Sequence, residues 1–381
     1  MKPKWTLILL LFLLLPQPAL SGPTALAPKE LARFHKACRR LIKRASLMSV
    51  MGREGWLLID NELEHLTAGR FWGKDALRKG RASARSERDS LPVLVDTQRQ
   101  MAELGIRLIL VPIPAKAIIY PESVFANPPL DKKGLPIRLD PQHQIFYDLL
   151  RQQGLEVWDP TSLFLAHRDD KRGPLYGKHD THYAGRATEL IAGALASKLA
   201  DLRPATPLKL ETEIRPQQVR GDLWQTYRLQ VSKAKRPKPE TLSLRFTGQR
   251  DPKGVLRPLP EDRKSPLLIF GDSHGLIFHA GGAMHAKGAG LADQLALALG
   301  MPVDVACVCG ENATKARLIL RRRQKADPSY LKGKKVAIWI FSVRGFSEED
   351  WVKVPLYKTI TRPKASSKRN RSKSSSNSSS P

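Results

Sequence analysis

A serine that directly follows an apolar run is the strongest candidate for a reactive group in this sequence. Ser273 ends the tripeptide Gly271-Asp272-Ser273, which comes straight after the apolar residues Leu267 to Phe270. A turn at the carboxyl end of a parallel strand places side chains where ligands of α/β proteins bind. Gly271 permits a tight turn, and the backbone N–H of Ser273 would then supply half of an oxyanion hole. The alternative is a turn in which Asp272 or Ser273 only caps backbone groups.

A second segment offers a base and a carboxylate for that serine. A serine hydroxyl becomes a useful nucleophile when an imidazole takes its proton and a carboxylate orients the imidazole. Asp180 and His182 are two positions apart, so in an extended backbone both side chains point to the same side. The pair could therefore reach Ser273 together. The alternative is that Asp180 caps the helix expected from Ala184 onward and that His182 packs near its start.

The sequence does not indicate metal or cofactor chemistry. Several of the nine histidines lie near the two segments, but their spacing matches no ligand set such as His-Glu-x-x-His. The cysteines lack paired metal-like spacing, and Cys307 and Cys309 are typical of small buried residues on a strand. The sequence leaves open whether Cys38 pairs with either of them. We therefore expect no metal and no cofactor.

Strands and helices alternate along most of the chain, which predicts an α/β fold with a mostly parallel sheet covered on both faces. Strands are predicted at 56–59, 106–111, 155–158, 267–270, 303–308 and 335–341. Helices are predicted at 90–104, 141–154, 184–202, 290–299 and 312–323. Residues 204–262 break this alternation and are rich in Pro, Lys, Arg and Thr. We predict a small β-rich insertion there, with strands at 226–231 and 241–246.

The two ends of the chain differ in composition from its middle. Lys2 and Lys4 precede a short apolar run at 7–15, followed by small residues, which predicts a secretory signal peptide at 1–21. The run falls well short of the roughly 20 residues that span a bilayer, and an uncleaved anchor is the alternative. We therefore expect a periplasmic protein. Residues 356–381 are predicted to form a disordered, basic, Ser-rich tail.

The chain is strongly basic, with a net charge of +28 from 64 basic and 36 acidic side chains among 381 residues. In an exported protein this charge favours a polyanionic partner such as an acidic polysaccharide or anionic lipid, although it could serve solubility alone. Residues 29–46, within an N-terminal segment at 22–48, have the spacing of a basic amphipathic helix. Such a helix could contact a membrane surface. The favoured alternative is that it packs its apolar stripe on its own domain.

From Gly52 to Val354 the sequence resembles the alginate O-acetyltransferase family, AlgJ and AlgX. The resemblance lies in GREGWLLIDNELEH at 52–65, PAK at 114–116, YPE at 120–122, YGKHDTH at 176–182, FGDSH at 270–274, the helix at 289–296 and the strand at 336–341. The order of the motif at 176–182 and the motif at 270–274 is specific, because in most SGNH hydrolases the Asp/His block follows the serine block. Here the Asp/His block comes first, as in these acetyltransferases.

The resemblance implies an SGNH-hydrolase-like, three-layer α/β/α domain at 49–355. It implies an O-acetyltransferase that acts on an exported, acidic polysaccharide through an acetyl-serine intermediate. Ser273 would be the nucleophile, His182 the base and Asp180 its orienting carboxylate. The implied partners are the polysaccharide acceptor and a membrane-bound O-acyltransferase that brings acetyl groups across the membrane. Nucleic acid is not an expected partner.

The sequence departs from the family pattern at several positions. Ser342-Val343-Arg344 stands where the family has Pro-Glu-Arg, and Tyr183 where it usually has Trp. The second oxyanion donor is not evident from the pattern, and Asn312 is the candidate. Two other functions stay open: an esterase that uses the same three residues with water, and a non-catalytic glycan-binding scaffold. Intact Asp180, His182 and Ser273 argue against the scaffold.

Overall fold

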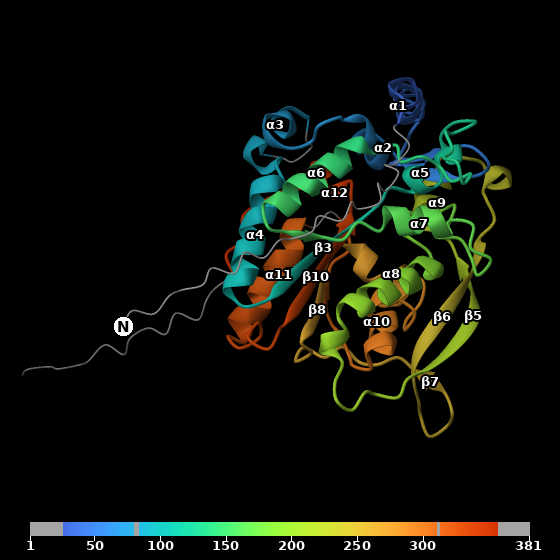
Figure 1. The fold of residues 1–381 in the computed structure, drawn as a ribbon. Helices are drawn as coiled ribbons and strands as arrows, with labels where there is room; N and C mark the ends of the chain where they lie inside the picture. The colour runs from blue at the N-terminus through green and yellow to red at the C-terminus, as the bar shows by residue number, and fades with distance from the viewer. Residues whose placement is uncertain (1–25, 80–83, 311–312, 357–381) are drawn as a thin grey trace, which may run out of the picture.

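The computed structural model describes residues 26–79, 84–310 and 313–356 (Figure 1). The predicted signal peptide at 1–21, Asn312, and all but the first residue of the predicted tail at 356–381 lie outside the described residues. Within those ranges, none of the helices is both long enough and apolar enough to span a bilayer.

A five-stranded parallel sheet forms the centre of the molecule, in the order β4-β3-β10-β8-β9. Its strands are β3 (Arg107–Ile113), β4 (Glu156–Val157), β8 (Leu267–Gly271), β9 (Asp304–Cys307) and β10 (Val336–Ser342). β8 and β10 are buried along their whole length, as expected for central strands covered on both faces. The predicted α/β fold is therefore confirmed, with β8 next to the middle strand.

Helices cover both faces of this sheet (Figure 1). They are α1 (Pro28–Ile42), α2 (Asp60–Thr67), α3 (Ala76–Lys79), α4 (Leu91–Glu103), α5 (Lys116–Ile119), α6 (Pro141–Gln152), α7 (Thr161–His167), α8 (Gly185–Lys198), α9 (Asp222–Tyr227), α10 (Leu291–Leu299), α11 (Ala313–Ala326) and α12 (Gly345–Glu348). Leu108 and Leu110 of β3 pack in the core with α4, α6 and α11. Ile109 and Val111 point to the opposite core, with α8 and α10. The alternation follows from the two-residue period of a strand.

The segment at 204–262 forms a separate antiparallel sheet of β5 (Glu211–Val219), β6 (Glu240–Arg250) and β7 (Leu256–Arg257). The predicted strand at 241–246 lies within β6. The predicted strand at 226–231 is wrong, because this stretch contains the end of α9 and the turns after it. Leu223 and Tyr227 of α9 pack against Leu57 and Ile59 instead. The true partner strand, β5, is almost wholly exposed, so it lacks the apolar alternation that would reveal a strand.

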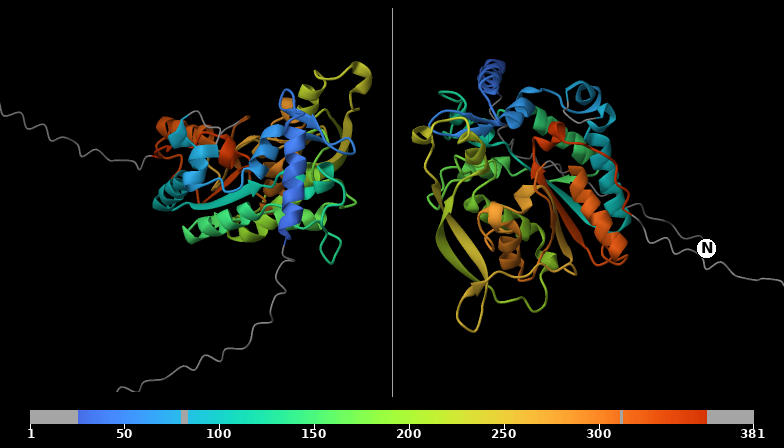
Figure 2. Two further views of the ribbon diagram at one scale, coloured as in Figure 1. Left: turned by 90° about the horizontal axis from the view of Figure 1, so that it is seen from above. Right: turned by 180° about the vertical axis from the view of Figure 1, so that it is seen from behind.

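The N-terminal helix α1 buries its apolar stripe in its own domain, with Phe34, Cys38 and Leu41 in the core. Its basic side chains remain on the outside, and the helix stands at the margin of the molecule (Figure 2). A short hairpin of β1 (Ser49–Met51) and β2 (Leu57–Ile59) follows it. The Leu57 backbone N–H donates to the Lys178 carbonyl over 2.8 Å. This hairpin therefore contacts the segment that carries Asp180 and His182.

Candidate active site

The turn after β8 is fixed by glycine and by the side chain of Asp272. Gly271 has φ of 145°, and a Cβ there would lie 1.7 Å from the Ile340 carbonyl oxygen, so only glycine fits. Asp272 caps the short helix that begins at Ser273 by accepting the His274 N–H at 2.8 Å. The other oxygen of Asp272 accepts the Ser342 N–H at 2.8 Å. Asp272 therefore caps backbone groups, and the Ser273 hydroxyl is left for another partner.

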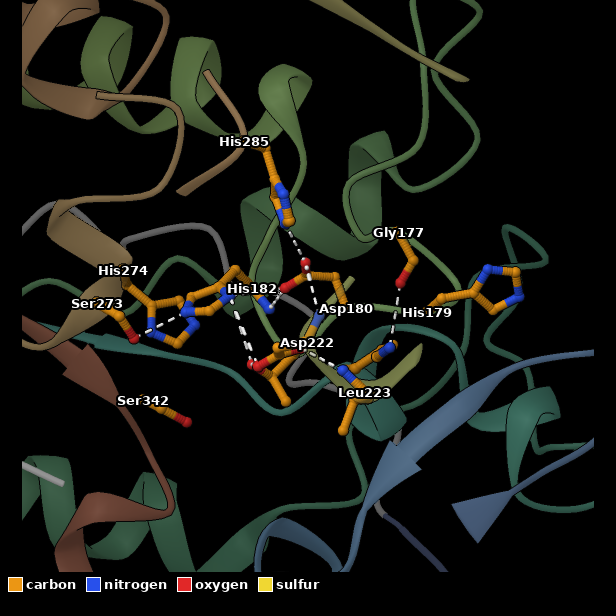
Figure 3. Close-up of polar contacts among 12 residues, drawn as sticks. Gly177, His179, Asp180, His182, Asp222, Leu223, Ser273, His274, His285 and Ser342 are labelled. Atoms are coloured by element: carbon orange, nitrogen blue, oxygen red, sulfur yellow. Dashed lines mark hydrogen bonds and ion pairs between the residues drawn. The ribbon is translucent and has the colours of Figure 1, made fainter. Parts of the chain in front are cut away.

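The structure brings Ser273, His182 and Asp180 into one hydrogen-bonded chain (Figure 3). Ser273 Oγ lies 2.7 Å from His182 Nε2, and His182 Nδ1 lies 2.6 Å from Asp180 Oδ1. The three residues are 7%, 5% and 4% exposed, so these bonds are largely shielded from water. Because a carboxylate accepts at Nδ1, we assign the ring proton there. Nε2 is then free to accept the serine proton, which is the arrangement of a serine nucleophile with its base.

A buried lysine supports the segment that carries Asp180 and His182. Lys116 Nζ donates to three carbonyls, those of Leu57 at 2.8 Å, Gly177 at 3.1 Å and Lys178 at 3.3 Å. The Glu240 carboxylate accepts the N–H groups of Lys178 and of the next residue at 2.8 and 2.9 Å. These contacts tie the start of the segment to β2, β6 and the turn after β3. The backbone just before Asp180 is therefore held in place by these contacts.

Close packing of the insertion fixes the same segment from another side. A Cβ at Gly221 would lie 2.0 Å from the His179 carbonyl oxygen, so glycine allows the two backbones to touch. The next residue, Asp222, accepts the Thr181 N–H at 2.8 Å and the Thr181 hydroxyl at 2.5 Å. Neither Asp180 nor His182 caps α8, which begins at Gly185. The capping alternative for Asp180 is therefore wrong.

The two buried partners perturb each other's pKa in opposite directions. Burial would raise the pKa of Asp180, but the charges and hydrogen bonds of His182 and His285 hold it well below its ordinary value. Burial likewise disfavours the charged form of His182, but the carboxylates of Asp180, Asp222 and Asp272 raise its pKa above 6.5. His182 is therefore paired with a carboxylate that stays ionised, as a general base requires.

Sequence reasoning missed two residues that lie against Asp180. His285 Nε2 is 2.7 Å from Asp180 Oδ2, and the Asp222 N–H donates to the same oxygen over 3.4 Å. Asp222 also has a carboxylate oxygen 4.0 Å from His182 Nδ1. Both residues come from segments far away in the sequence, and no spacing connects them with Asp180. His285 lies near the serine motif in the sequence, which is the only signal that could have suggested it.

Asp180, His182 and Asp222 offer ligand atoms within 4.8 Å of one another, close enough to hold a metal ion. A metal on His182 Nδ1 would have to displace the proton shared with Asp180. The Asp222 oxygens are already used by Thr181. The hydrogen-bonded arrangement accounts for all three side chains, so we assign them to it.

The second half of the oxyanion hole is not defined by the described residues. The backbone N–H of Ser273 has no acceptor within the part of the chain that the structure describes, which leaves it available to a substrate oxygen. Asn312, the predicted second donor, lies outside that part. Arg344 Nη1 donates to Ser342 Oγ over 3.3 Å at the end of β10.

A cavity of about 730 Å³ adjoins this site on the side of Asp222 and His285. Its walls come from the insertion and from the loop after the serine turn. The lining residues are Gln218, Arg220, Asp222, Gln225, Pro239, Gly282, Ala283, Met284 and His285. The walls therefore carry amide, guanidinium and carboxylate groups, which suit a hydrophilic ligand.

The structure combines a parallel α/β sheet with a serine just after β8 that is bonded to His182 and, through it, to Asp180, an arrangement that occurs in several hydrolase-like α/β folds. A family model described as the SGNH hydrolase-like domain of the acetyltransferase AlgX matches residues 50–339, and the chain belongs to this family. The family expected from the sequence motifs is thereby confirmed.

Curated relatives are similar over part of their length. The chain is 25% identical over 152 residues to the probable alginate O-acetylase AlgJ of Pseudomonas aeruginosa, covering 40% of this chain and 33% of that protein. It is 26% identical over 230 residues to the protein of the same name from Pseudomonas putida, covering 59% of this chain and 54% of the relative. The matches thus span between a third and about half of the relatives' length.

Two solved structures share the fold. The O-acetyltransferase domain of Pseudomonas putida AlgJ superposes with a TM-score of 0.55 at 20% identity, covering 79% of this chain and 93% of that one. Pseudomonas aeruginosa AlgX superposes with a TM-score of 0.53 at 15% identity, covering 80% and 63%. At these identities the likeness concerns the fold, and the activity has to be argued from the site.

Proposed function

We propose that this protein is an O-acetyltransferase that moves an acetyl group to a hydroxyl of an exported, acidic polysaccharide through an acetyl-serine intermediate. The observation that carries the proposal is the contact of 2.7 Å between Ser273 Oγ and His182 Nε2, with Asp180 on the other ring nitrogen. Membership in an acetyltransferase family supports acetyl transfer. The relatives named as alginate O-acetylases support a polysaccharide acceptor.

The first half of the reaction forms the acetyl-enzyme. Ser273 Oγ attacks the carbonyl carbon of an acetyl donor while its proton passes to His182 Nε2. The backbone N–H of Ser273 donates to the oxyanion of the tetrahedral intermediate. The bond to the leaving group breaks, and the leaving group takes the proton from His182. Asp180 stays ionised and stabilises the imidazolium that forms between the two proton transfers.

The second half repeats these steps with the acceptor. A sugar hydroxyl gives its proton to His182 Nε2 and attacks the acetyl-serine carbonyl. The bond to Ser273 Oγ then breaks, and the serine recovers its proton from the imidazolium. Water in place of the sugar would give hydrolysis by the same residues. Transfer therefore depends on an acceptor that is bound next to the serine when the acetyl-enzyme forms.

The place of action in this proposal is the periplasm, with a membrane-bound O-acyltransferase as the source of acetyl groups. The signal-like composition of residues 1–21 supports export. The α1 region supports a contact with an anionic membrane surface, because Lys36, Arg39 and Arg40 are exposed there. Leu47 and Met48, just after the helix, are 55% and 56% exposed. With the apolar stripe of α1 buried, such a contact would be mainly electrostatic.

The experiment that tests this proposal compares acetate release from a chromogenic acetyl ester with acetyl transfer to an acidic oligosaccharide. Purified wild type, Ser273→Ala and Ser197→Ala are measured side by side, because Ser197 is an exposed serine on α8. We expect transfer by wild type and Ser197→Ala and none by Ser273→Ala. Acetate release without transfer would assign an esterase. Oligosaccharide binding without any turnover would assign a scaffold.

A further inference from the structure

His285 is the second histidine in contact with the carboxylate of Asp180. Its Nε2 lies 2.7 Å from Asp180 Oδ2, whereas His182 Nδ1 binds Oδ1. Figure 3 shows the two rings approaching Asp180 from different sides. The side chain of His285 is 13% exposed and that of Asp180 5%. The contact therefore lies at the boundary between the buried site and the adjoining cavity.

The other contacts of Asp180 show what His285 contributes. Oδ1 accepts two bonds from His182, from its backbone N–H at 2.9 Å and from its ring at 2.6 Å. Oδ2 accepts the bond from His285 and a long bond of 3.4 Å from the Asp222 N–H. Without His285, this oxygen of a buried anion would keep one weak donor. The bond from His285 therefore fixes the plane of the carboxylate, and that plane orients the His182 ring.

The backbone of His285 adopts a conformation that suggests a functional constraint. Its φ of 66° lies in the left-handed region, which residues other than glycine rarely adopt. The bonds of this turn hold the conformation, because the Ala286 N–H donates to the Met284 carbonyl over 2.8 Å around His285 and the His285 N–H donates to the Gly282 carbonyl over 3.0 Å. Strain of this kind persists where the surrounding structure over-determines it, and it concentrates at functional sites.

We propose that His285 is a positioning residue for the reaction, acting through Asp180 on His182. This inference rests on the proposed function of Ser273, His182 and Asp180. His285 holds the carboxylate in the plane that His182 needs, and its N–H draws part of the negative charge of Asp180 away from the His182 ring. Because His285 is also part of the cavity wall, a ligand in the cavity would touch the residue that orients the base.

The charged groups near His285 in the described part of the chain come from Asp180, from the insertion and from its own loop. Asp180 faces it directly, and Asp222 and Arg220 line the same cavity from the insertion. Lys287 follows on the same loop and is exposed. Loss of the His285 N–H would leave the full charge of Asp180 acting on His182. The pKa of His182 would then rise further, and more of the base would be protonated at a given pH.

The test uses His285→Phe, which keeps a ring without a donor, and His285→Gln, which keeps a donor. Lys287→Gln, on the same loop, is the control. We expect His285→Phe to lower kcat for the acetyl ester about 10- to 100-fold, the effect of a slightly misplaced catalytic group, with KM little changed. The acidic limb of its rate profile should move to higher pH. His285→Gln should restore most of the rate and the position of the limb.

An NMR titration of the His182 ring in the same full-length variants gives a readout that does not need turnover. We expect the pKa of His182 to rise in His285→Phe and to return toward the wild-type value in His285→Gln. A wild-type rate and a wild-type His182 pKa in His285→Phe would overturn the inference. Equal losses in both variants would overturn it too, because the donor would then be irrelevant. Failure of the proposed function would instead appear as a rate that Ser273→Ala leaves unchanged.

Discussion

Asp222 accepts the hydroxyl of Thr181 over 2.5 Å, so the insertion is bonded to the residue between Asp180 and His182. A second bond from the Thr181 N–H at 2.8 Å fixes both oxygens of this carboxylate. One of them lies 4.0 Å from His182 Nδ1. Asp222 is 47% exposed in its side chain and faces the cavity. The insertion therefore supplies both a support and a negative charge to the base.

Removal of the Asp222 charge should shift the pH dependence of the reaction. Catalysis needs neutral His182, so the rate rises with pH through the pKa of His182, which lies above 6.5. Burial lowers this pKa, and Asp180 and Asp222 are among the carboxylates that raise it. Asp222→Asn should therefore move the acidic limb to lower pH, with a smaller effect on the alkaline plateau.

The control for this prediction is Asp148→Asn on α6, which removes the same charge from a side chain that is 69% exposed. It should leave the limb in place, because exposed charges far from the site are screened. The measurement is kcat/KM for an acetyl ester between pH 5 and 9. An unchanged limb in Asp222→Asn, or an equal shift in both variants, would show that Asp222 does not act on His182.

Replacement of Lys116 should destabilise the protein strongly. Lys116 is 1% exposed, and its ammonium donates to the carbonyls of Leu57, Gly177 and Lys178. Lys116→Met leaves these acceptors without their donor and should cost about 3 kcal/mol or more, because each buried acceptor without a partner costs about 1–3 kcal/mol. Urea unfolding measures the change. Lys132→Met, at an exposed position, should change the stability by less than about 0.5 kcal/mol.

The same lysine predicts a dependence of stability on pH. Burial, opposed by Asp180 and Glu62, lowers the pKa of Lys116 from 10.5 to about 8. Between these two values the unfolded chain binds a proton that the folded protein does not, so stability contributed by this group rises with pH. The free energy of unfolding of wild type minus that of Lys116→Met should increase from pH 8 to 10.5. A constant difference would mean that the pKa of Lys116 is not lowered.

Gly271→Ala should damage both the fold and the site. The added Cβ would lie 1.7 Å from the Ile340 carbonyl oxygen, at a φ of 145°. We expect a loss of more than about 1 kcal/mol of stability and a fall of about 100-fold in kcat from displacement of Ser273. Gly193→Ala is the matched control, because Gly193 is an exposed α8 residue with open space around it. It should stabilise the protein by up to about 1 kcal/mol in thermal unfolding.

The central sheet could be predicted from the sequence because most residues of its longer strands are apolar. The apolar runs at 267–270 and 335–341 correspond to β8 and β10. Both strands are buried along their whole length, as a continuous apolar run predicts. The serine turn was predictable for the same reason, since it follows such a strand directly. Asp180 and His182 could be paired from their spacing, but the expected extended backbone is wrong: residues 181–182 form a bend, in which the Asp180 carboxylate also accepts the His182 N–H at 2.9 Å.

The rest of the site depends on contacts between distant segments, which local pattern does not encode. His285 reaches Asp180 across 105 positions, and Asp222 reaches Thr181 across 41. β5 was missed because it pairs with β6 through its backbone while its side chains stay exposed. Lys116 lies in a motif that supported the family resemblance. The reason for a lysine there is visible only in the structure, where its ammonium donates to the carbonyls of Gly177 and Lys178.

Trapping an acetyl group on Ser273 is the most direct test of the proposed acetyl-serine intermediate. Wild-type protein is mixed with an acetyl ester donor in the absence of acceptor, quenched in acid within the first turnovers, digested and analysed by mass spectrometry. We expect one acetyl group on the peptide that contains Ser273, and its loss when an acceptor glycan is added before the quench. Turnover of the donor with no acetyl group on Ser273, or turnover by Ser273→Ala at the wild-type rate, would contradict it.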